Sequence, residues 1–182
     1  MKRRNALRSM SLSFGGSVVL PIAIFQSCQR DDYQAKFLTL DQIELLDEIG
    51  ETILPETEDS HGAKFINIGK FMDHFIADCY SSEDQDLITA GLLTFESSCS
   101  KKYNTGFVNI SAESKFDYLV LINAEASKSN EPHYFLKLKE LILLGYFTSE
   151  EGATKALQYL PVPGKFEGDI KINTDHKAWA LG

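Results

Sequence analysis

Apolar residues recur every three or four positions over most of the chain after residue 38, which is the spacing of one face of an α-helix. The first such run follows Thr39-x-x-Gln42, the pattern of a capping box, and ends at Pro55. The second run occupies residues 66–80, and a polar, acidic stretch at residues 55–64 separates it from the first. The two runs therefore predict two amphipathic helices joined by a solvated loop.

The third and fourth predicted helices each begin at a serine. Ser82-x-x-Gln85 is another capping-box pattern, and the helix that it opens runs toward the basic pair Lys101-Lys102, which suits a helix C-terminus. Ser111 caps the fourth helix. The spacing predicts that this fourth helix turns four apolar side chains inward: Phe116, Leu119, Val120 and Ile122.

The fifth predicted helix is the most apolar one in the chain, so we expect it at the centre of the bundle. Pro132 suits its first turn, and Gly145 suits the position just after its end, where a left-handed residue often stops a helix. Thr148-x-x-Glu151 then predicts the cap of a sixth helix. Almost no stretch alternates with the period of a β-strand, so the pattern predicts an all-α domain of five or six helices.

The chain changes character after Tyr159. Two prolines, Pro161 and Pro163, exclude a helix and fix an extended arm. The remaining tail to residue 182 has no period, but it contains several large apolar side chains, including Trp179. We therefore expect an irregular C-terminal arm and tail that lie over the surface of the domain rather than a disordered extension.

The first 27 residues have the layout of an export signal, because four basic residues and no acid precede an apolar run of moderate length. The order Arg3-Arg4-x-x-Leu7-Arg8 resembles a twin-arginine signal, which directs proteins that are exported already folded. Paired arginines also occur in ordinary secretory signals, so both export routes stay open.

The signal ends at Ser27-Cys28, which resembles a loose lipoprotein cleavage site. Cleavage before Cys28 would leave a lipid anchor, and residues 28–38 would form a polar tether to a domain at residues 39–182. The alternative is a plain secretory signal followed by an incidental cysteine. In either case we expect an exported protein, periplasmic or attached to a cell-envelope membrane.

Charge narrows the choice of partner. The leader holds four of the 18 basic residues and no acid, so the rest of the chain has 14 basic and 26 acidic residues and a net charge of −12. Nucleic-acid binding requires a basic surface, which argues against that class of function. A strongly acidic domain suits a partner with a basic face.

Cys79 and Cys99 lie on two successive predicted helices, and an antiparallel helix pair could bring them together as a disulfide in an oxidising compartment. Two separate buried thiols are an equally good interpretation.

Searches for catalytic and cofactor-binding patterns give no candidate. The four histidines are scattered without metal-ligand spacing, and the acidic loop at residues 55–64 lacks the alternate spacing of a calcium loop. The chain contains no GxGxxG, no P-loop, no CxxCH and no GxSxG. We therefore predict no catalytic residue, no metal site and no bound cofactor in this chain.

Two long runs near the C-terminus, Gly145-Tyr-Phe-Thr-Ser149 and Tyr159-Leu-Pro-Val-Pro-Gly164, resemble the small subunit of membrane-associated gluconate 2-dehydrogenase flavoenzymes, the subunit 3 family. Residues 51–55, the segment from Asp78 to Leu92 and the twin-arginine leader agree with it. The chain departs from the family at His61, where a proline commonly precedes Gly-Ala.

This resemblance implies a non-catalytic accessory subunit of a dehydrogenase complex. The partner would be a large sugar or polyol dehydrogenase subunit that contains FAD, often together with a cytochrome c subunit that takes the electrons. The small subunit would assist the export, folding or anchoring of the flavoprotein. The alternative is a free-standing helical lipoprotein that acts as a scaffold or chaperone.

If a partner binds, the aromatic helix ends, the proline arm and the tail are the predicted interface, because aromatic side chains are enriched at interface centres. The predicted contact residues are Tyr146, Phe147, Tyr159, Pro161, Pro163 and Trp179.

Overall fold

The computed structural model describes residues 33–162, 164, 169, 171 and 176–180. The chain divides after Gln34 into two units, and every element named below belongs to the second, Ala35–Gly182. The predicted export signal with Arg3 and Arg4, and the predicted lipidation site Cys28, lie outside the described residues, as does Pro163.

The described part is a helical bundle, as the apolar spacing predicts. Its elements are α2 (Leu40–Ile53), α3 (Ile68–Cys79), α4 (Ser82–Tyr103), a 3₁₀ turn η1 (Phe107–Asn109), α5 (Ala112–Ala126), α6 (Tyr134–Thr148) and a π-helical turn η2 (Gly152–Ala156). No strand occurs among these residues, and no described helix is long and apolar enough to cross a membrane. The all-α prediction is confirmed.

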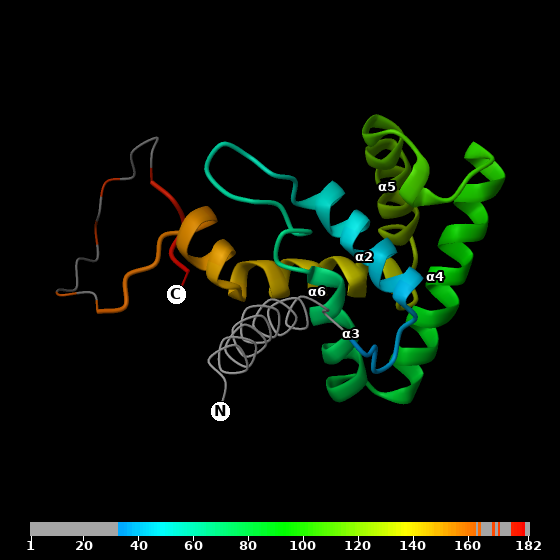
Figure 1. Cartoon of the computed structure of the whole chain (residues 1–182), viewed down its shortest axis with the longest axis horizontal. Helices are drawn as coiled ribbons and strands as arrows, with labels where there is room; N and C mark the ends of the chain where they lie inside the picture. Colours follow the sequence, from blue (N-terminus) through cyan, green and yellow to red (C-terminus); the bar gives the residue numbers. More distant parts are fainter. Residues whose placement is uncertain (1–32, 163, 165–168, 170, 172–175, 181–182) are drawn as a thin grey trace, which may run out of the picture. The chain divides into compact units, whose positions relative to one another are not determined.

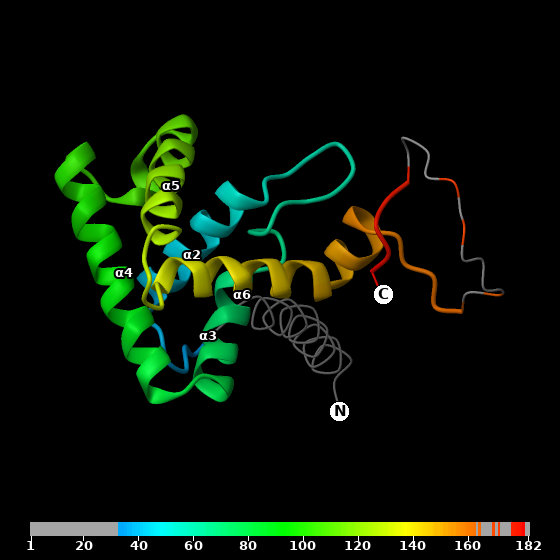
Figure 2. The ribbon, with the colours of Figure 1, turned by 180° about the vertical axis from the view of Figure 1, so that it is seen from behind.

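The fifth predicted helix, α6, is the central one. It packs against α3, α4 and α5 and lies across the middle of the bundle, with α4 and α5 toward one end (Figure 1). The view from behind shows the same arrangement (Figure 2). Seven of its fifteen residues are buried, which is expected for a helix with neighbours on several sides.

Gly145 does not end this helix, contrary to the prediction. It lies inside α6 in right-handed conformation and is buried. A Cβ atom there would lie 2.5 Å from the ring of Phe71 and 2.6 Å from Ile68 Cδ1 on α3. The glycine is therefore needed because α3 approaches α6 closely, and not because the backbone turns there.

Two of the predicted caps are confirmed and two are displaced by one residue. Thr39 and Gln42 form the complete capping box of α2, and Ser111 caps α5. The cap of α4 is Ser81 rather than Ser82. Gln85 is therefore not its capping-box partner, and its side-chain amide instead donates to the carbonyl of Ile76 at the end of α3 (2.9 Å).

The predicted sixth helix is shorter than expected. Ser149, and not Thr148, accepts the backbone N–H of Gly152 (3.1 Å), and the turn that follows is the single π-helical turn η2. Leu157 N–H donates to the carbonyl of Gly152 (2.9 Å) and closes that turn.

The inward face of α5 also differs from the prediction. Leu119 and Ile122 are buried as expected, but Phe116 and Val120 are 60% and 50% exposed. Tyr118 takes the buried place, and its hydroxyl donates to the carbonyl of Phe95 (2.9 Å). Both faces of α5 carry apolar residues, so the period alone does not identify the inner one.

Asp73 fixes the entry of the chain into the bundle. It is fully buried on α3, and its carboxylate accepts the backbone N–H groups of Lys36 (2.7 Å), Phe37 (2.9 Å) and Leu38 (2.6 Å). Leu38 is itself 4% exposed. The last three residues of the predicted tether are thus bound to the domain.

Candidate partner-binding surfaces

The end of α6, the turn η2, the described part of the proline arm and the segment at Trp179 together form a corner, which carries five of the six predicted contact residues. Tyr146 is only 3% exposed. Its hydroxyl donates to the carbonyl of His61 (2.6 Å), and His61 N–H donates to the Glu151 carboxylate beside η2 (2.8 Å). These bonds hold the loop at residues 55–64 against the corner, so Tyr146 has a structural role in this chain.

The other described contact residues of the corner are more accessible. The ring of Phe147 is half-buried and packs edge-on against Tyr146 at 5.2 Å between centroids. Tyr159 and Trp179 are 44% and 43% exposed, and Pro161 is also exposed. Whether any of them contacts a partner stays a prediction.

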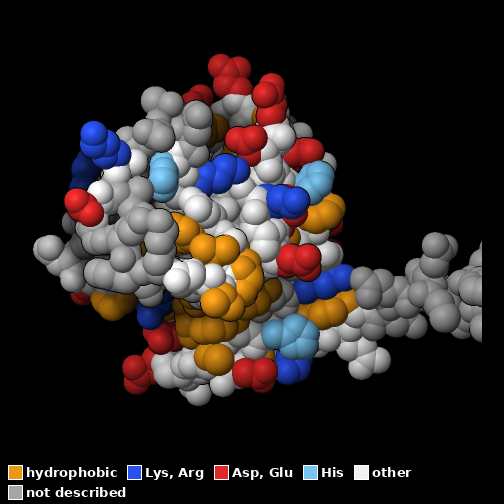
Figure 3. Space-filling model, turned by 90° about the vertical axis from the view of Figure 1, so that its left-hand side faces the viewer, with side chains coloured by type: hydrophobic (Ala, Val, Ile, Leu, Met, Phe, Trp, Pro, Cys, Tyr) orange, Lys and Arg blue, Asp and Glu red, His pale blue; other side chains and the backbone are white. Residues whose placement is uncertain are grey.

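The end of the tail is attached to this corner. Gln158 and Trp179 form a parallel β-bridge, in which Gln158 N–H donates to the carbonyl of Ala178 (2.8 Å) and Ala180 N–H donates to that of Gln158 (3.0 Å). The described end of the tail therefore lies against the segment just before the proline arm. Figure 3 shows hydrophobic side chains gathered on the side of the molecule at the left of Figure 1, with acidic, basic and histidine side chains around them.

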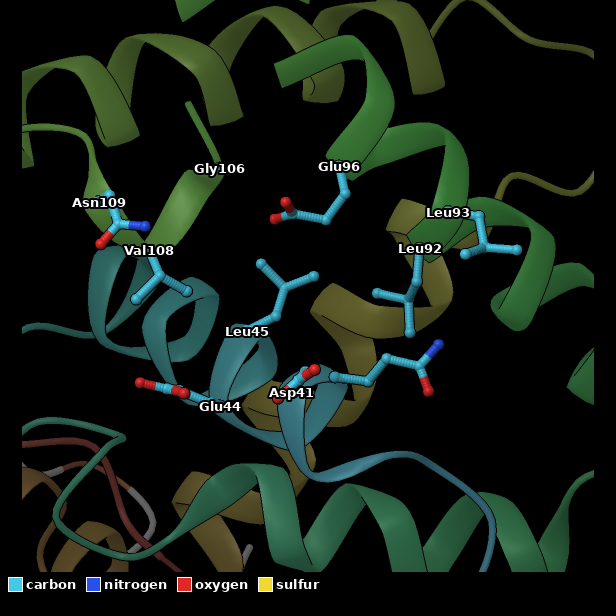
Figure 4. A pocket seen from close by; sticks show the side chains of 10 residues that line it. Asp41, Glu44, Leu45, Leu92, Leu93, Glu96, Gly106, Val108 and Asn109 are labelled. Atoms are coloured by element: carbon cyan, nitrogen blue, oxygen red, sulfur yellow. The ribbon is translucent and has the colours of Figure 1, made fainter. Parts of the chain in front are cut away.

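A second feature is an open pocket of about 390 Å³ between α2, α4 and η1 (Figure 4). Leu45 and Leu92 are buried and form its apolar wall, while Asp41 and Glu44 on α2 lie on one side. Glu96 projects from α4 into the same space. The sequence predicts none of these residues as a site residue, because they come from separate elements and share no sequence motif.

One oxygen of the Glu96 carboxylate lacks a hydrogen-bond partner. Its Oε1 atom is buried and has no hydrogen-bond partner, and no ion pair of Glu96 occurs within the described residues. Gly106 faces its other oxygen, and a Cβ atom at Gly106 would lie 3.1 Å from it. The bundle thus leaves room for this carboxylate but supplies no donor to one of its oxygens.

A shallower groove of about 310 Å³ lies between α2, α5 and α6. Its apolar lining includes the exposed side chains Phe116 and Val120. Lys139 on α6 donates to the side-chain oxygen of Asn123 on α5 (2.6 Å) and is therefore already engaged within the chain.

Glu48 joins three segments of the bundle through two lysines. Glu48 on α2 accepts from Lys115 (2.6 Å) on α5 and from Lys64 in the loop before α3. Burial favours the neutral form of Glu48, but the bonds from the two lysines outweigh it, so the pKa of Glu48 lies below its ordinary value. The same pairing raises the pKa of Lys64.

The two cysteines differ in environment. Cys79 at the end of α3 is exposed, and Cys99 on α4 is buried; both are free thiols in the structure. Burial raises the pKa of Cys99. In the part of the chain that the structure describes, no group of three or more His, Cys, Asp or Glu residues could hold a metal ion.

Comparison with known proteins agrees with the resemblance. The model of the family described as gluconate 2-dehydrogenase subunit 3 matches residues 40–164, which is more than half of the chain and spans α2 to the proline arm. Neither the curated proteins nor the solved structures yielded a match. The chain therefore belongs to the gluconate 2-dehydrogenase subunit 3 family.

Proposed function

We propose that this chain is a non-catalytic accessory subunit of a membrane-associated, FAD-dependent sugar or polyol dehydrogenase of the gluconate 2-dehydrogenase type. It would assist the export, folding or anchoring of the flavoprotein subunit. FAD would be bound by that larger subunit, and haem c by a cytochrome subunit where one is present.

The observation that carries the proposal is the family match over residues 40–164. The family is described as a subunit, which implies that the chain works in an assembly with other chains. The matched residues include both the helical core and the corner at the end of α6.

The exposed aromatic side chains of the corner support a contact role. Tyr159 and Trp179 keep more than two fifths of their surface exposed although the tail is hydrogen-bonded to Gln158 beside them. Large aromatic residues that stay exposed on an ordered surface are typical interface anchors.

The leader supports the export and anchoring part of the proposal. A flavoprotein folds around FAD before it leaves the cytoplasm, so a twin-arginine signal at Arg3-Arg4 could carry a folded pair of chains through one export event. A lipid on Cys28 would then hold the pair at the membrane.

The proposal is tested by immunoprecipitating the untagged chain from native membranes in mild detergent. We expect a larger chain in stoichiometric amount, a flavin absorption spectrum in the eluate, and dye reduction on addition of gluconate or a related polyol. A chain that elutes alone and without flavin would refute the proposal and favour a free-standing scaffold or chaperone.

Export and anchoring are tested separately by cell fractionation. The variant Arg3→Lys/Arg4→Lys should retain both chains in the cytoplasm, whereas Arg8→Lys, the matched control, should not. Cys28→Ser should release the complex from the membrane fraction without preventing export.

A further inference from the structure

The lining of the pocket between α2, α4 and η1 carries acidic side chains and no basic one. Asp41, Glu44 and Glu96 contribute carboxylates to its lining, and no lysine, arginine or histidine lines it. Neither α2 acid forms an ion pair with another described residue. A group that enters this pocket therefore meets a lining with net negative charge, of which Glu44 also interacts electrostatically with Lys64 outside the pocket.

Glu96 contributes to the pocket a carboxylate oxygen that lacks a hydrogen-bond donor. Buried polar atoms in native proteins are nearly always hydrogen-bonded, and each exception calls for an explanation. Oε1 of Glu96 is the one side-chain atom in the described part of the chain that is buried and lacks a partner. Because this oxygen is closed off from solvent, a donor from outside the chain reaches it only when the Glu96 side chain turns toward the open pocket.

The spacing of the acids favours an organic cation over a metal ion. No three acidic residues of the described chain lie close enough together to hold a metal. The carboxylates instead lie on opposite sides of a cavity of about 390 Å³, with Leu45 and Leu92 between them (Figure 4). An extended cation with an aliphatic stem matches this combination, because the stem packs on leucine while the charged head reaches the acids.

The rim of the pocket resembles a protein interface. Leu93 and Val108 line it, and Leu93 is 65% exposed. Apolar groups around a charged anchor exclude water from it, which is the usual surrounding of an interface hot spot. Arginine is enriched at such centres, since its planar fork can bond two acceptors at once.

We propose that this pocket receives an arginine side chain from the flavoprotein subunit, with Glu96 as its principal acceptor. The identity of the partner rests on the proposed function. A second copy of this domain does not fit, because residues 31–182 contain no arginine at all. The net charge of −12 outside the leader also opposes self-association and favours a basic partner.

The pocket is tested first without any partner, by NMR titration of the full chain in detergent with N-acetyl-arginine methylamide. The citrulline analogue has the same length and shape but no charge, so it is the matched control ligand. We expect the arginine compound to shift the amide signals of Gly106 and Glu96, and the citrulline compound to leave them unchanged. Equal responses to both compounds, or shifts only elsewhere, would overturn the proposal.

The second test uses the complex. Glu96→Gln removes the charge without changing the shape, and we expect it to weaken retention of the flavoprotein at least tenfold. Glu113→Gln on α5, an exposed acid outside the pocket, should leave retention unchanged. Because Glu96 forms no ion pair within the described chain, Glu96→Gln should not lower the Tm of the free subunit, which separates a binding defect from unfolding.

A photocrosslinker placed at Leu93 identifies the occupant. We expect a linked peptide from the flavoprotein that contains arginine. A peptide without arginine, or one from this chain itself, would refute the proposal while the accessory function stands. If wild-type chain retains no flavoprotein, the proposed function fails, and the comparison of arginine with citrulline still decides whether the pocket binds a guanidinium group.

Discussion

Replacing Asp73 by asparagine should destabilise the domain far more than an ordinary surface substitution. The Asp73 carboxylate is fully buried and accepts three consecutive backbone N–H groups at 2.6–2.9 Å. Asparagine has one acceptor oxygen, and its NH₂ group would face a backbone N–H that also donates. Hydrogen bonds to charged groups are worth about 1.5–3 kcal/mol each, so losing one and weakening the others should cost about 2–4 kcal/mol.

Thermal or urea denaturation measures this effect. For a domain of this size a loss of 1 kcal/mol lowers Tm by about 2–4 °C, so Asp73→Asn should lower it by about 5–15 °C. Amide hydrogen exchange should show the cause, because the N–H groups of Lys36, Phe37 and Leu38 should lose their protection before the helices do.

Asp78→Asn is the matched control. Asp78 lies on the same helix and pairs with the side chain of Lys36 at 2.9 Å, but both side chains are largely exposed. Exposed ion pairs contribute about 0–1 kcal/mol, so this variant should unfold almost like wild type. Equal losses in the two variants, or a loss below about 0.5 kcal/mol for Asp73→Asn, would refute the anchoring role of Asp73.

Three further predictions concern packing, pH and thiol access. Gly145→Ala should lower the free energy of unfolding in urea by about 1–3 kcal/mol because the added methyl group overlaps α3, although alanine is the better helix former. Gly164→Ala is the control: no atom lies within 4 Å of the added methyl group, so it should be neutral. Equal effects of the two variants would contradict the packing argument. The lowered pKa of Glu48 means that its stabilisation is complete above its unfolded value of 4.5 and disappears as the pH falls through the folded value. The stability difference between wild type and Glu48→Gln should therefore be constant near neutrality and shrink below about pH 4.5, and a pH-independent difference would exclude this linkage. Brief N-ethylmaleimide treatment and peptide mapping should label Cys79 in the native chain and Cys99 only after unfolding, whereas rapid labelling of both, or a disulfide between them, would contradict the structure.

The sequence predicts the helices well because their signals are local. The capping box at Thr39 and the cap at Ser111 act within three residues, and both are confirmed. At Ser81-Ser82 the local signal is ambiguous, because either serine precedes a stretch of acids that suits a first turn. The cap is Ser81, and the Gln85 side chain bonds the end of α3. This bond joins two helices, so no local sequence pattern predicts it.

Contacts between helices account for the other differences. Gly145 has the sequence context of a helix stop, but its actual cause is the approach of Phe71 from 74 residues away along the chain. Tyr118 is buried and Phe116 is exposed, contrary to the prediction for Phe116, and the Tyr118 hydroxyl bonds the carbonyl of Phe95 on another helix. Such choices depend on the tertiary arrangement and have no counterpart in the spacing of one helix.

The family resemblance and the candidate arginine pocket depend on different residues of the chain. Gly145 and Tyr146 belong to the most patterned run of the chain, and the structure explains both by packing and by a hydrogen bond to the loop. Glu96 and Leu93 lie in the amphipathic helix α4, where the sequence pattern does not distinguish them from other surface residues. A long motif in this chain therefore identifies the fold and the family, whereas a contact site on its surface becomes visible only when a buried carboxylate oxygen is found without a partner.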